Sequence, residues 1–398
     1  MKEISKKIWD FIDKYKIWIF VAIITILAFC IRISLFSSTF GDYEMFIEPW
    51  FNELKEGGGL LALGKGIGNY NAPYMTILAL LTYLPIPSLI SVKLVSVIFD
   101  FICAIAVAKI TLYVLKDNKH KSAIALVLYG ITLFLPTVFL NSAFWGQADS
   151  IYTAFILLSL LYLMKQKYIK AFVFLGVAFA FKLQFIFILP LFILIYISER
   201  KFSIFHFAIP VVVNFAMCLP SIIFGNTLTN CLNVYIGQVG TYNQYITLNF
   251  PNIYSIFFGN GSSHLINSPN DYLPKIGILV TLFIFVIIAF LVLYKKPKFT
   301  PKAIVEFGLW SVMICTFFLP HMHDRYLFVG DVLAIVFFLF NRKKFYVPIL
   351  VQFISMYGYM NMLFSSFELE MKYMGIAYLV LMIIYSKDMY KIYFLSEK

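Results

Sequence analysis

The sequence IWIFVAIITILAFCIRISLFSSTFGDYE, residues 17–44, decides the fold class of this chain. Its apolar part, 17–36, is long enough to cross a bilayer as one helix, and the first carboxylates beyond it are those of Asp42 and Glu44. The run is too long for the core of a signal peptide, and no cleavage site of small residues follows it. It therefore predicts a membrane helix that the mature chain keeps.

The residues before this run are basic. Five lysines precede it, and flanking lysines favour the cytoplasmic side of a membrane: Lys2, Lys6, Lys7, Lys14 and Lys16. The whole chain has a net charge of +12, which in a soluble protein would suggest a nucleic-acid partner. Here Lys and Arg gather in short connectors between apolar runs, as cytoplasmic anchors do. The expected partner is therefore the lipid bilayer, and no nucleic-acid partner is expected.

Composition extends the prediction to the full length. Hydrophobic residues make up 61% of the chain and charged residues 13%, against roughly 25% charged in a soluble domain. The mean hydropathy is +0.86, which is typical of a polytopic membrane protein. The five cysteines show no paired spacing and are expected to act as small apolar residues.

Further apolar runs alternate with basic connectors and predict an all-α fold of about 12 transmembrane helices. After 17–36 the expected spans are 89–115, 121–136, 148–165, 169–182, 185–198, 203–224, 273–294, 302–319, 326–340, 345–364 and 371–386. The connectors 116–121, 165–170, 199–201, 295–302 and 341–344 fall in the cytoplasm only if 73–87 does not cross by itself. Pro85 and Pro87 interrupt that stretch, so we expect a short helix on the outer surface. Both termini are then cytoplasmic.

No linker or repeat divides the chain, so a single membrane domain over 1–398 is predicted in the cell membrane. Its non-spanning parts are the basic N-terminus 1–16, a first outer loop with surface helices over 37–88, and a large outer loop over 225–272. The aromatic content of the large loop argues against disorder.

This topology places the unusual polar residues on one face of the membrane. They come from five separate segments: Asp42 and Glu44; Asn69 to Asn71; Asn141, Trp145, Gln147 and Asp149; Lys182 and Gln184; and His321 to Arg325. The opposite face has only short basic connectors. We therefore expect an active site on the extracytoplasmic side, assembled from several helices.

The order of these motifs resembles a known family. The matching pieces are Gly41-Asp42-Tyr43-Glu44 with Pro49-Trp50, Asn69-Tyr70-Asn71-Ala72-Pro73-Tyr74, Lys93 with Asp100, Trp145-Gly146-Gln147-Ala148-Asp149-Ser150, Lys182-Leu183-Gln184 and His321-Met322-His323-Asp324-Arg325-Tyr326. Over about 30–340 the chain resembles the membrane-embedded C-type (GT-C) glycosyltransferases, in the bacterial branch related to the GPI-anchor mannosyltransferases (PIG-V-like).

The resemblance implies transfer of a single hexose, with inversion, from a polyprenyl-phosphate carrier to an acceptor hydroxyl. In such enzymes an acid of the first outer loop is the general base, which corresponds to Asp42 here. Many members have two adjacent acids at this point, whereas Tyr43 separates them in this chain. Glu44 and Asp149 are then the candidates for a second acid. No cofactor is named by the sequence, and a divalent metal (Mg²⁺ or Mn²⁺) stays open. The acceptor could be a cell-envelope polymer, a lipid glycan or a protein.

The chemistry agrees with these assignments. A lipid phosphate is a good leaving group, so the site needs one base for the attacking hydroxyl and a cation for the phosphate. Arg325 suits the phosphate because its planar fork donates two parallel hydrogen bonds. Further phosphate-binding candidates are Lys182, His323 and Lys93. Sugar or acceptor contacts are predicted for Asn69, Tyr70, Asn71, Tyr74, Trp145, Gln147, Gln184 and Asn249.

Several of these residues also have structural interpretations. Asp42 could cap a helix over 43–56, and Arg325 could simply pair with Asp324. Lys93 and Asp100 are seven residues apart on one helical face, where a structural ion pair is the alternative. Arg32 could extend its head group to the membrane interface. His321 and His323 are two residues apart and cannot share a helical face, so a helical metal site is not expected, although a site completed by Asp42 stays open.

Two other function classes remain open at this stage. A secondary transporter or lipid-glycan flippase would also have many spans and intramembrane charge, but related halves with broken helices are not visible in this sequence. A glycan ligase would share the outer site and differ in its donor, an oligosaccharide on a lipid pyrophosphate.

Overall fold

The structure is a computed structural model that describes residues 2–241, 245–259, 272–364 and 369–395. Its N-terminal half comprises α1 (Lys2–Ser34), η1 (Tyr43–Ile47), α2 (Glu48–Glu56), η2 (Gly59–Lys65), α3 (Ala72–Leu81), α4 (Ser88–Val114), α5 (Lys121–Phe134), α6 (Pro136–Phe139), η3 (Leu140–Trp145), α7 (Asp149–Met164), α8 (Tyr168–Phe181), η4 (Leu183–Phe187) and α9 (Leu189–Glu199). There follow η5 (Ile204–Ala208), α10 (Ile209–Ile223), α11 (Leu228–Thr241), β1 (Thr247–Leu248), α12 (Ile253–Phe258), α13 (Leu273–Lys295), α14 (Pro301–Phe318), β2 (Met322–His323), α15 (Phe328–Phe340), η7 (Arg342–Lys344), α16 (Tyr346–Phe364), α17 (Met371–Tyr390) and η8 (Lys391–Leu395).

The predicted all-helical character is confirmed, and a helix lies at each of the twelve expected spans. The expected number of twelve membrane spans is not confirmed. Among the described residues, six helices are long and apolar enough to cross a membrane, or seven if the pair Lys121–Phe134 and Pro136–Trp145, bent by 51°, counts as one span. Four of the expected spans fall on helices of 10–17 residues: Asp149–Met164, Tyr168–Phe181, Leu183–Glu199 and Phe328–Phe340. These helices are shorter than the roughly 20 residues that a crossing needs.

The remaining expected span, α17, is long enough but contains Lys372, Lys387 and Asp388, which lower its apolar content. The short helix expected within 73–87 is present as α3, and Tyr74, Met75 and Leu78 bury it against α2 and η2. The large loop 225–272 contains α11, β1 and α12 in its described part, while 260–271 lie outside the described residues.

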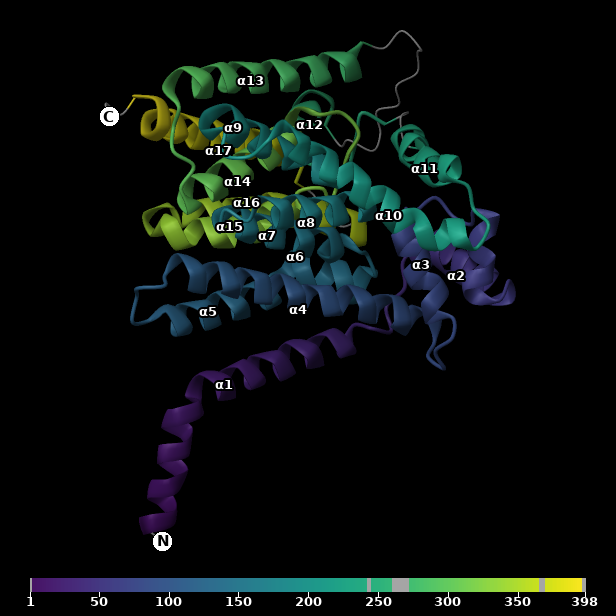
Figure 1. Cartoon of the computed structure of the whole chain (residues 1–398), viewed down its shortest axis with the longest axis horizontal. Coiled ribbons are helices and arrows are strands. Elements are labelled where there is room, and N and C mark those ends of the chain that lie inside the picture. The colour runs from purple at the N-terminus through teal and green to yellow at the C-terminus, as the bar shows by residue number, and fades with distance from the viewer. Residues whose placement is uncertain (1, 242–244, 260–271, 365–368, 396–398) are drawn as a thin grey trace.

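The helices form one bundle (Figure 1), and they differ widely in how deeply they are buried. Every residue from Ala303 to Phe317 of α14 is buried, including Glu306, whose carboxylate accepts a hydrogen bond from Asn341 Nδ2 at 2.8 Å. In contrast, α13 exposes Leu279, Phe283 and Phe290, each by more than half of its surface. Such an outer apolar face is compatible with a lipid environment.

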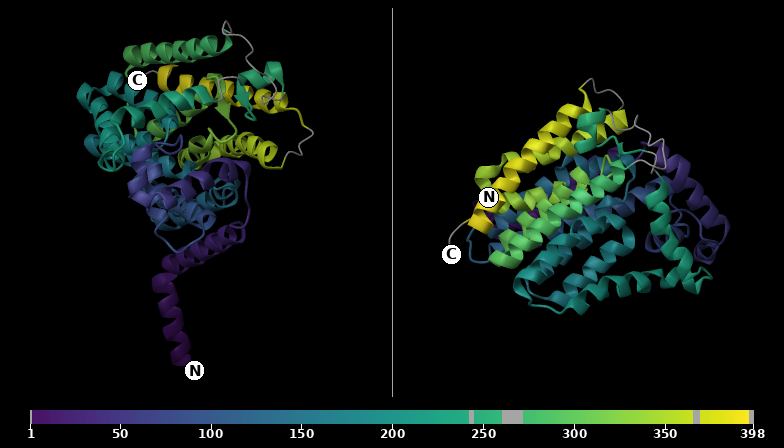
Figure 2. Two further views of the ribbon diagram at one scale, coloured as in Figure 1. Left: turned by 90° about the vertical axis from the view of Figure 1, so that its right-hand side faces the viewer. Right: turned by 90° about the horizontal axis from the view of Figure 1, so that it is seen from above.

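The bundle has two different ends. Figure 1 shows α2, α3 and α11 together at one end, and the turn between α4 and α5 at the other. The first half of α1 extends away from the bundle, as Figure 2 also shows. The polar segments expected to form a site therefore have the α2–α3–α11 end in common.

Two buried cations hold the helices at this end, and both differ from expectation. Arg32 is fully buried and does not reach an interface: its Nε lies 2.8 Å from Asp100 Oδ2, and its Nη2 donates to the carbonyl of Leu133. The ion pair of Lys93 with Asp100, the structural alternative for these residues, is therefore not formed. Lys93 Nζ instead donates to four backbone carbonyls, those of Leu35, Phe36, Ser38 and Phe144, at 2.5–3.2 Å.

Candidate active site

A cavity of about 350 Å³ opens between the segment 42–74, the turn after α8 and the loop 319–327, and we call it the Asp42 cavity. It brings together eight of the predicted site residues: Asp42, Asn69, Tyr70, Tyr74, Lys182, Gln184, His323 and Arg325. The rest of its wall is mainly apolar: Phe46, Ile47, Trp50, Ala148, Ile151, Phe181, Leu183, Ile186, Phe187, Ile278, Leu319, Pro320 and Met322, with Gln238, His321 and Tyr326. The predicted convergence of separate segments is thus found.

Asp42 is held by contacts across the bundle rather than by its own helix. It has helical backbone angles, and its side chain makes no capping hydrogen bond, so the helix-cap interpretation is wrong. Its Oδ2 accepts a hydrogen bond of 2.6 Å from Gln147 Nε2 and lies 3.7 Å from Arg325 Nη1. The side chain keeps 23% of its surface exposed, so the carboxylate is oriented but accessible from the cavity.

Gln147 reaches Asp42 because of the turn that precedes it. η3 ends at Gly146, whose φ of 81° is left-handed and suits glycine, and the amide of Gln147 then donates to the carbonyl of Asn141 at 2.8 Å. Lys93 fixes the same turn through the carbonyl of Phe144 and the segment before Asp42 through that of Ser38. Lys93 is therefore a scaffold residue outside the cavity. Its position does not support the expected role in phosphate binding.

Arg325 lies among three carboxylates. Its Nη1 is 3.7 Å from Asp42 and 3.5 Å from Asp324 Oδ1, and its Nε is 3.4 Å from Asp149 Oδ2. The expected pair with Asp324 is present but is only one of these three contacts. All three distances exceed the roughly 2.7–2.9 Å of a charge-assisted hydrogen bond, so the guanidinium keeps donor capacity.

Asp149 is the buried anchor of this cluster. Its side chain is fully buried and contacts Lys182 Nζ through Oδ1, while Oδ2 accepts from Asn141 Nδ2 at 2.9 Å. Asn141 also donates to the hydroxyl of Tyr359 at 2.9 Å. Because Asp149 touches Arg325 and Lys182 but does not line the cavity, it orients both cations.

Two aromatic side chains support the guanidinium from behind. Its Cζ lies 5.1 Å from the ring centroid of Trp145, in cation–π geometry. The Trp145 ring is 1% exposed and meets Tyr359 edge to face. The sugar contact predicted for Trp145 is therefore wrong in position, since the ring faces Arg325 inside the protein.

The loop carrying Arg325 is anchored by a short parallel strand pair. Thr247 pairs with Met322 and Leu248 with His323. His321 has a left-handed φ of 60°, and its amide donates to the carbonyl of Ile246 at 2.8 Å. Across the loop, Gly358 of α16 packs closely: a Cβ there would lie 2.8 Å from the carbonyl oxygen of Asn249 and 3.0 Å from that of Asp324.

Burial shifts the titration of three loop residues beside the cavity. It raises the pKa of Asp324 to about 7, an effect that Arg325 opposes and the charges of Asp42 and Asp149 reinforce. Burial, together with the charges of Arg325 and Lys182, holds the pKa of His323 well below its usual value. His323 is thus a neutral group at pH 7 rather than a cation for phosphate. Burial also raises the pKa of Tyr70 to about 12, so its phenol stays protonated.

Three aromatic rings line one part of the cavity. The rings of Trp50 and Tyr70 have centroids 5.3 Å apart, and those of Tyr70 and Tyr74 are 5.1 Å apart. Such a ladder offers flat apolar faces with polar edges, and those features suit a pyranose ring or a lipid chain.

Three further predicted residues also lie outside the cavity. Glu44 is exposed on η1. Asn71 is buried at the start of α3, where its Oδ1 accepts from Gln238 Nε2 at 3.2 Å. Asn249 contacts Asn361 and Met362 of α16. Their predicted roles in acid catalysis or sugar contact are not supported by position.

Gln238, on α11, was not predicted. It lines the Asp42 cavity and donates to the carbonyl of Asn69 at 2.8 Å. The sequence offered no signal beyond the polar character of 225–272, because α11 reaches the site only through tertiary packing.

Within the described ranges, no group of three or more His, Cys, Asp or Glu side chains is arranged to hold a metal ion. The carboxylates near Asp42 contact Arg325 and Lys182 instead.

Comparison with protein-family models and with curated proteins finds no match to this chain. The resemblance stated from the motifs therefore stays a prediction.

Proposed function

We propose that the chain is a membrane glycosyltransferase that moves a single hexose from a polyprenyl-phosphate carrier to an acceptor hydroxyl, with Asp42 as general base. One observation carries the proposal. An oriented, accessible carboxylate and two cations, Arg325 and Lys182, open on the same cavity of about 350 Å³, whose other walls are largely apolar and aromatic.

The composition of the cavity matches both ends of such a donor. A polyprenyl phosphate has a long apolar chain and one compact anion, and the cavity has apolar walls from Phe46, Ile186 and Leu319 and a cationic side at Arg325 and Lys182. Small-molecule sites typically combine apolar walls with a few oriented polar groups in about 300–1,000 Å³.

The transfer step balances with these residues alone. The acceptor oxygen attacks the anomeric carbon, forming a new C–O bond, while the bond from that carbon to the phosphate oxygen breaks. The bonding pair leaves with the polyprenyl phosphate, where Arg325 and Lys182 stabilise the added negative charge. The hydroxyl proton passes to the Asp42 carboxylate. Attack opposite the leaving phosphate gives inversion.

The charge of the cluster sets a limit on donor binding. Asp42, Asp149 and Asp324 face Arg325 and Lys182, which leaves one negative charge in excess when Asp324 is ionised and none when it is protonated. A phosphate is thus better accommodated while Asp324 is neutral, and its pKa of about 7 makes this a physiological variable.

The test uses the purified full chain in nanodiscs with a panel of polyprenyl-phosphate hexoses. We expect one donor to be consumed, with hexose appearing on an acceptor or slowly on water. Asp42→Asn should lower turnover by a factor of about 10² or more, the range for loss of a general base, without changing thermal stability. Glu44→Gln is the matched control, because Glu44 is an exposed acid two residues away.

Near-normal turnover by Asp42→Asn would remove Asp42 as base. Consumption of no polyprenyl-phosphate hexose, combined with movement of a lipid-linked glycan between leaflets in the same vesicles, would favour the flippase. Activity only with a lipid-pyrophosphate oligosaccharide would favour the ligase.

A further inference from the structure

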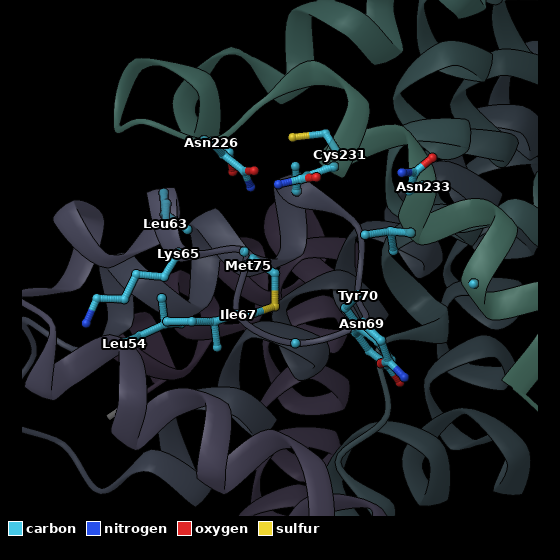
Figure 3. A pocket seen from close by; sticks show the side chains of 17 residues that line it. Leu54, Leu63, Lys65, Ile67, Asn69, Tyr70, Met75, Asn226, Cys231 and Asn233 are labelled. Carbon is cyan, nitrogen blue, oxygen red and sulfur yellow. The ribbon is translucent and has the colours of Figure 1, made fainter.

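A second cavity, of about 380 Å³, lies beside the first, between α11 and the segment from α2 to α3 (Figure 3). Asparagine side chains contribute most of its polar lining, so we call it the Asn-rich cavity. It is lined by Leu54, Leu63, Lys65, Gly66, Ile67, Gly68, Asn69, Tyr70, Ala72, Met75, Ser221, Asn226, Asn230, Cys231, Asn233, Val234 and Gly237.

The two cavities share a wall. Asn69 and Tyr70 line both of them. On α11, Gly237 lines the Asn-rich cavity and its neighbour Gln238 lines the Asp42 cavity. A hydrogen bond of 2.8 Å from Gln238 Nε2 to the carbonyl of Asn69 joins α11 to this wall. A molecule held in the Asn-rich cavity is therefore separated from the Asp42 cavity by this shared wall.

Apart from Lys65, the polar part of the lining is uncharged. Lys65 is its only ionisable cation among the residues named, and Figure 3 shows its amine directed away from the asparagines. Its Nζ lies 3.5 Å from the position of a Cβ on Gly57, which is not part of the lining. No carboxylate lines the cavity. Neither a polyanion nor a cation is thus suited to the interior.

Two amides of the lining keep their hydrogen-bonding capacity. Asn230 and Asn233 are both exposed on α11, and their side chains make no hydrogen bond to any described residue. An amide offers two donors and an acceptor, which complement a hydroxyl group that both donates and accepts. Several hydroxyls on one small ring are the property of a sugar.

We propose that the Asn-rich cavity is the acceptor site and holds an uncharged, hydroxyl-rich sugar unit of a glycan acceptor. This inference rests on the proposed function. The bound unit presents a hydroxyl past Asn69 and Tyr70 to Asp42, which takes its proton as the oxygen bonds to the anomeric carbon of the donor. The acceptor class is then a neutral glycan rather than a polyanionic polymer.

A cavity-filling variant tests the site. A Cβ added at Gly237 meets no described heavy atom within 4 Å, and φ there is not left-handed, so Gly237→Phe places a ring in the cavity without backbone strain. Ile236→Phe is the matched control on the same helix, since Ile236 is 73% exposed and is not part of the lining. Asn230→Leu with Asn233→Leu removes the amides at nearly constant volume.

The first readout is binding, measured by ligand-observed NMR on nanodisc protein. The probes are methyl glycosides of a mannobioside, a cellobioside and a lactoside, with a glucuronic-acid disaccharide as the charged comparison. We expect a neutral probe to bind wild type and Ile236→Phe but not Gly237→Phe. The double Asn variant should weaken binding about tenfold, as expected for the loss of one or two hydrogen bonds. Binding of the charged probe alone, or equal binding by Gly237→Phe, would overturn the assignment.

The second readout separates this inference from the proposed function. Slow transfer of the donor hexose to water needs the Asp42 cavity but no glycan acceptor. We expect Gly237→Phe to retain this reaction within twofold while its acceptor KM rises at least tenfold, a loss comparable to that of the double Asn variant. An unchanged acceptor KM in both variants would contradict the acceptor site but not the proposed transferase function. Sugar binding without any donor reaction would contradict the transferase function but not the sugar site.

Discussion

Arg325 makes its ion pairs through Nε and Nη1, at distances of 3.4–3.7 Å. Among the described contacts, none of these pairs involves Nη2, and Nε has no hydrogen-bond partner. The guanidinium is therefore held in place by charge while its fork remains open to a bidentate anion.

Replacing the fork by a point charge should affect one substrate. Arg325→Lys is expected to raise the donor KM by about tenfold or more and leave the acceptor KM within a factor of two, because one ammonium cannot donate two parallel bonds to phosphate. Steady-state kinetics with each substrate varied in turn measures this. Equal effects on both substrates would instead indicate that Arg325 only supports the carboxylate cluster.

The raised pKa of Asp324 predicts a pH dependence. Below about pH 7 the carboxyl is neutral, and above it the added negative charge competes with phosphate for Arg325. The donor KM should rise as pH increases from 6 to 8, and Asp324→Asn should flatten this profile. A profile unchanged in the variant would contradict the assignment.

Ionisation of Asp324 also opposes folding, so its contribution to stability should fall between about pH 4 and pH 7.

At the scale of elements, α16 fixes the position of the loop 319–327 through Gly358. Gly358→Ala places a methyl group 3.0 Å from the carbonyl oxygen of Asp324 in this loop and 2.8 Å from that of Asn249, so both segments must move. We expect a loss of about 1–3 kcal/mol in unfolding free energy, as for other overpacked sites, together with lower activity. Gly130→Ala in α5 is the control, because its methyl group meets only Ile24 at an ordinary 3.5 Å.

Thermal unfolding and donor turnover measure the pair of variants. The control should be neutral or slightly stabilising, since alanine favours the helix over glycine. If Gly358→Ala matched the control in both measurements, the loop would not depend on α16.

Helices could be predicted where apolar runs alternate with basic connectors. Features that depend on residues distant in the sequence could not. Apolar runs between basic connectors gave twelve helices because each run carries its own signal. The expected bounds were close: α8 has the 14 residues expected, and α15 ends at Phe340 as expected but begins at Phe328 rather than at 326.

The candidate site could likewise be predicted only in part: its residues were identified, but their contacts were not. Asp42, Lys182 and Arg325 were placed together because ionisable groups in an apolar chain are few. Their particular partners were not. Spacing within α4 suggested that Lys93 pairs with Asp100, yet Arg32 of α1 takes Asp100 and Lys93 takes carbonyls, which have no signature in the sequence.

At the scale of the whole molecule, the arrangement predicts which end faces outward. Thr229 on α11 and Lys298 after α13 are both exposed. Single cysteines at these positions, in a cysteine-free background, would be probed on intact cells with an impermeant thiol reagent. Cysteine at position 229 should react and cysteine at 298 should not, because the carrier-linked sugar meets its acceptor outside.

The reversed labelling pattern would place Asp42 on the cytoplasmic side, beside nucleotide sugars, and the polyprenyl-phosphate mechanism would fall. Permeabilised cells supply the positive control, since both positions should then react.

The pairing of β1 with β2 also determines when during synthesis the site can exist. Thr247 bonds to a carbonyl 75 residues further along the chain, and contacts of such separation close late. Until α13 and α14 have been inserted and the ribosome has released the loop beyond them, Asp42 has no Arg325 to face it. The Asp42 cavity is thus completed among the last steps of biogenesis, after most of the helical core is already in place.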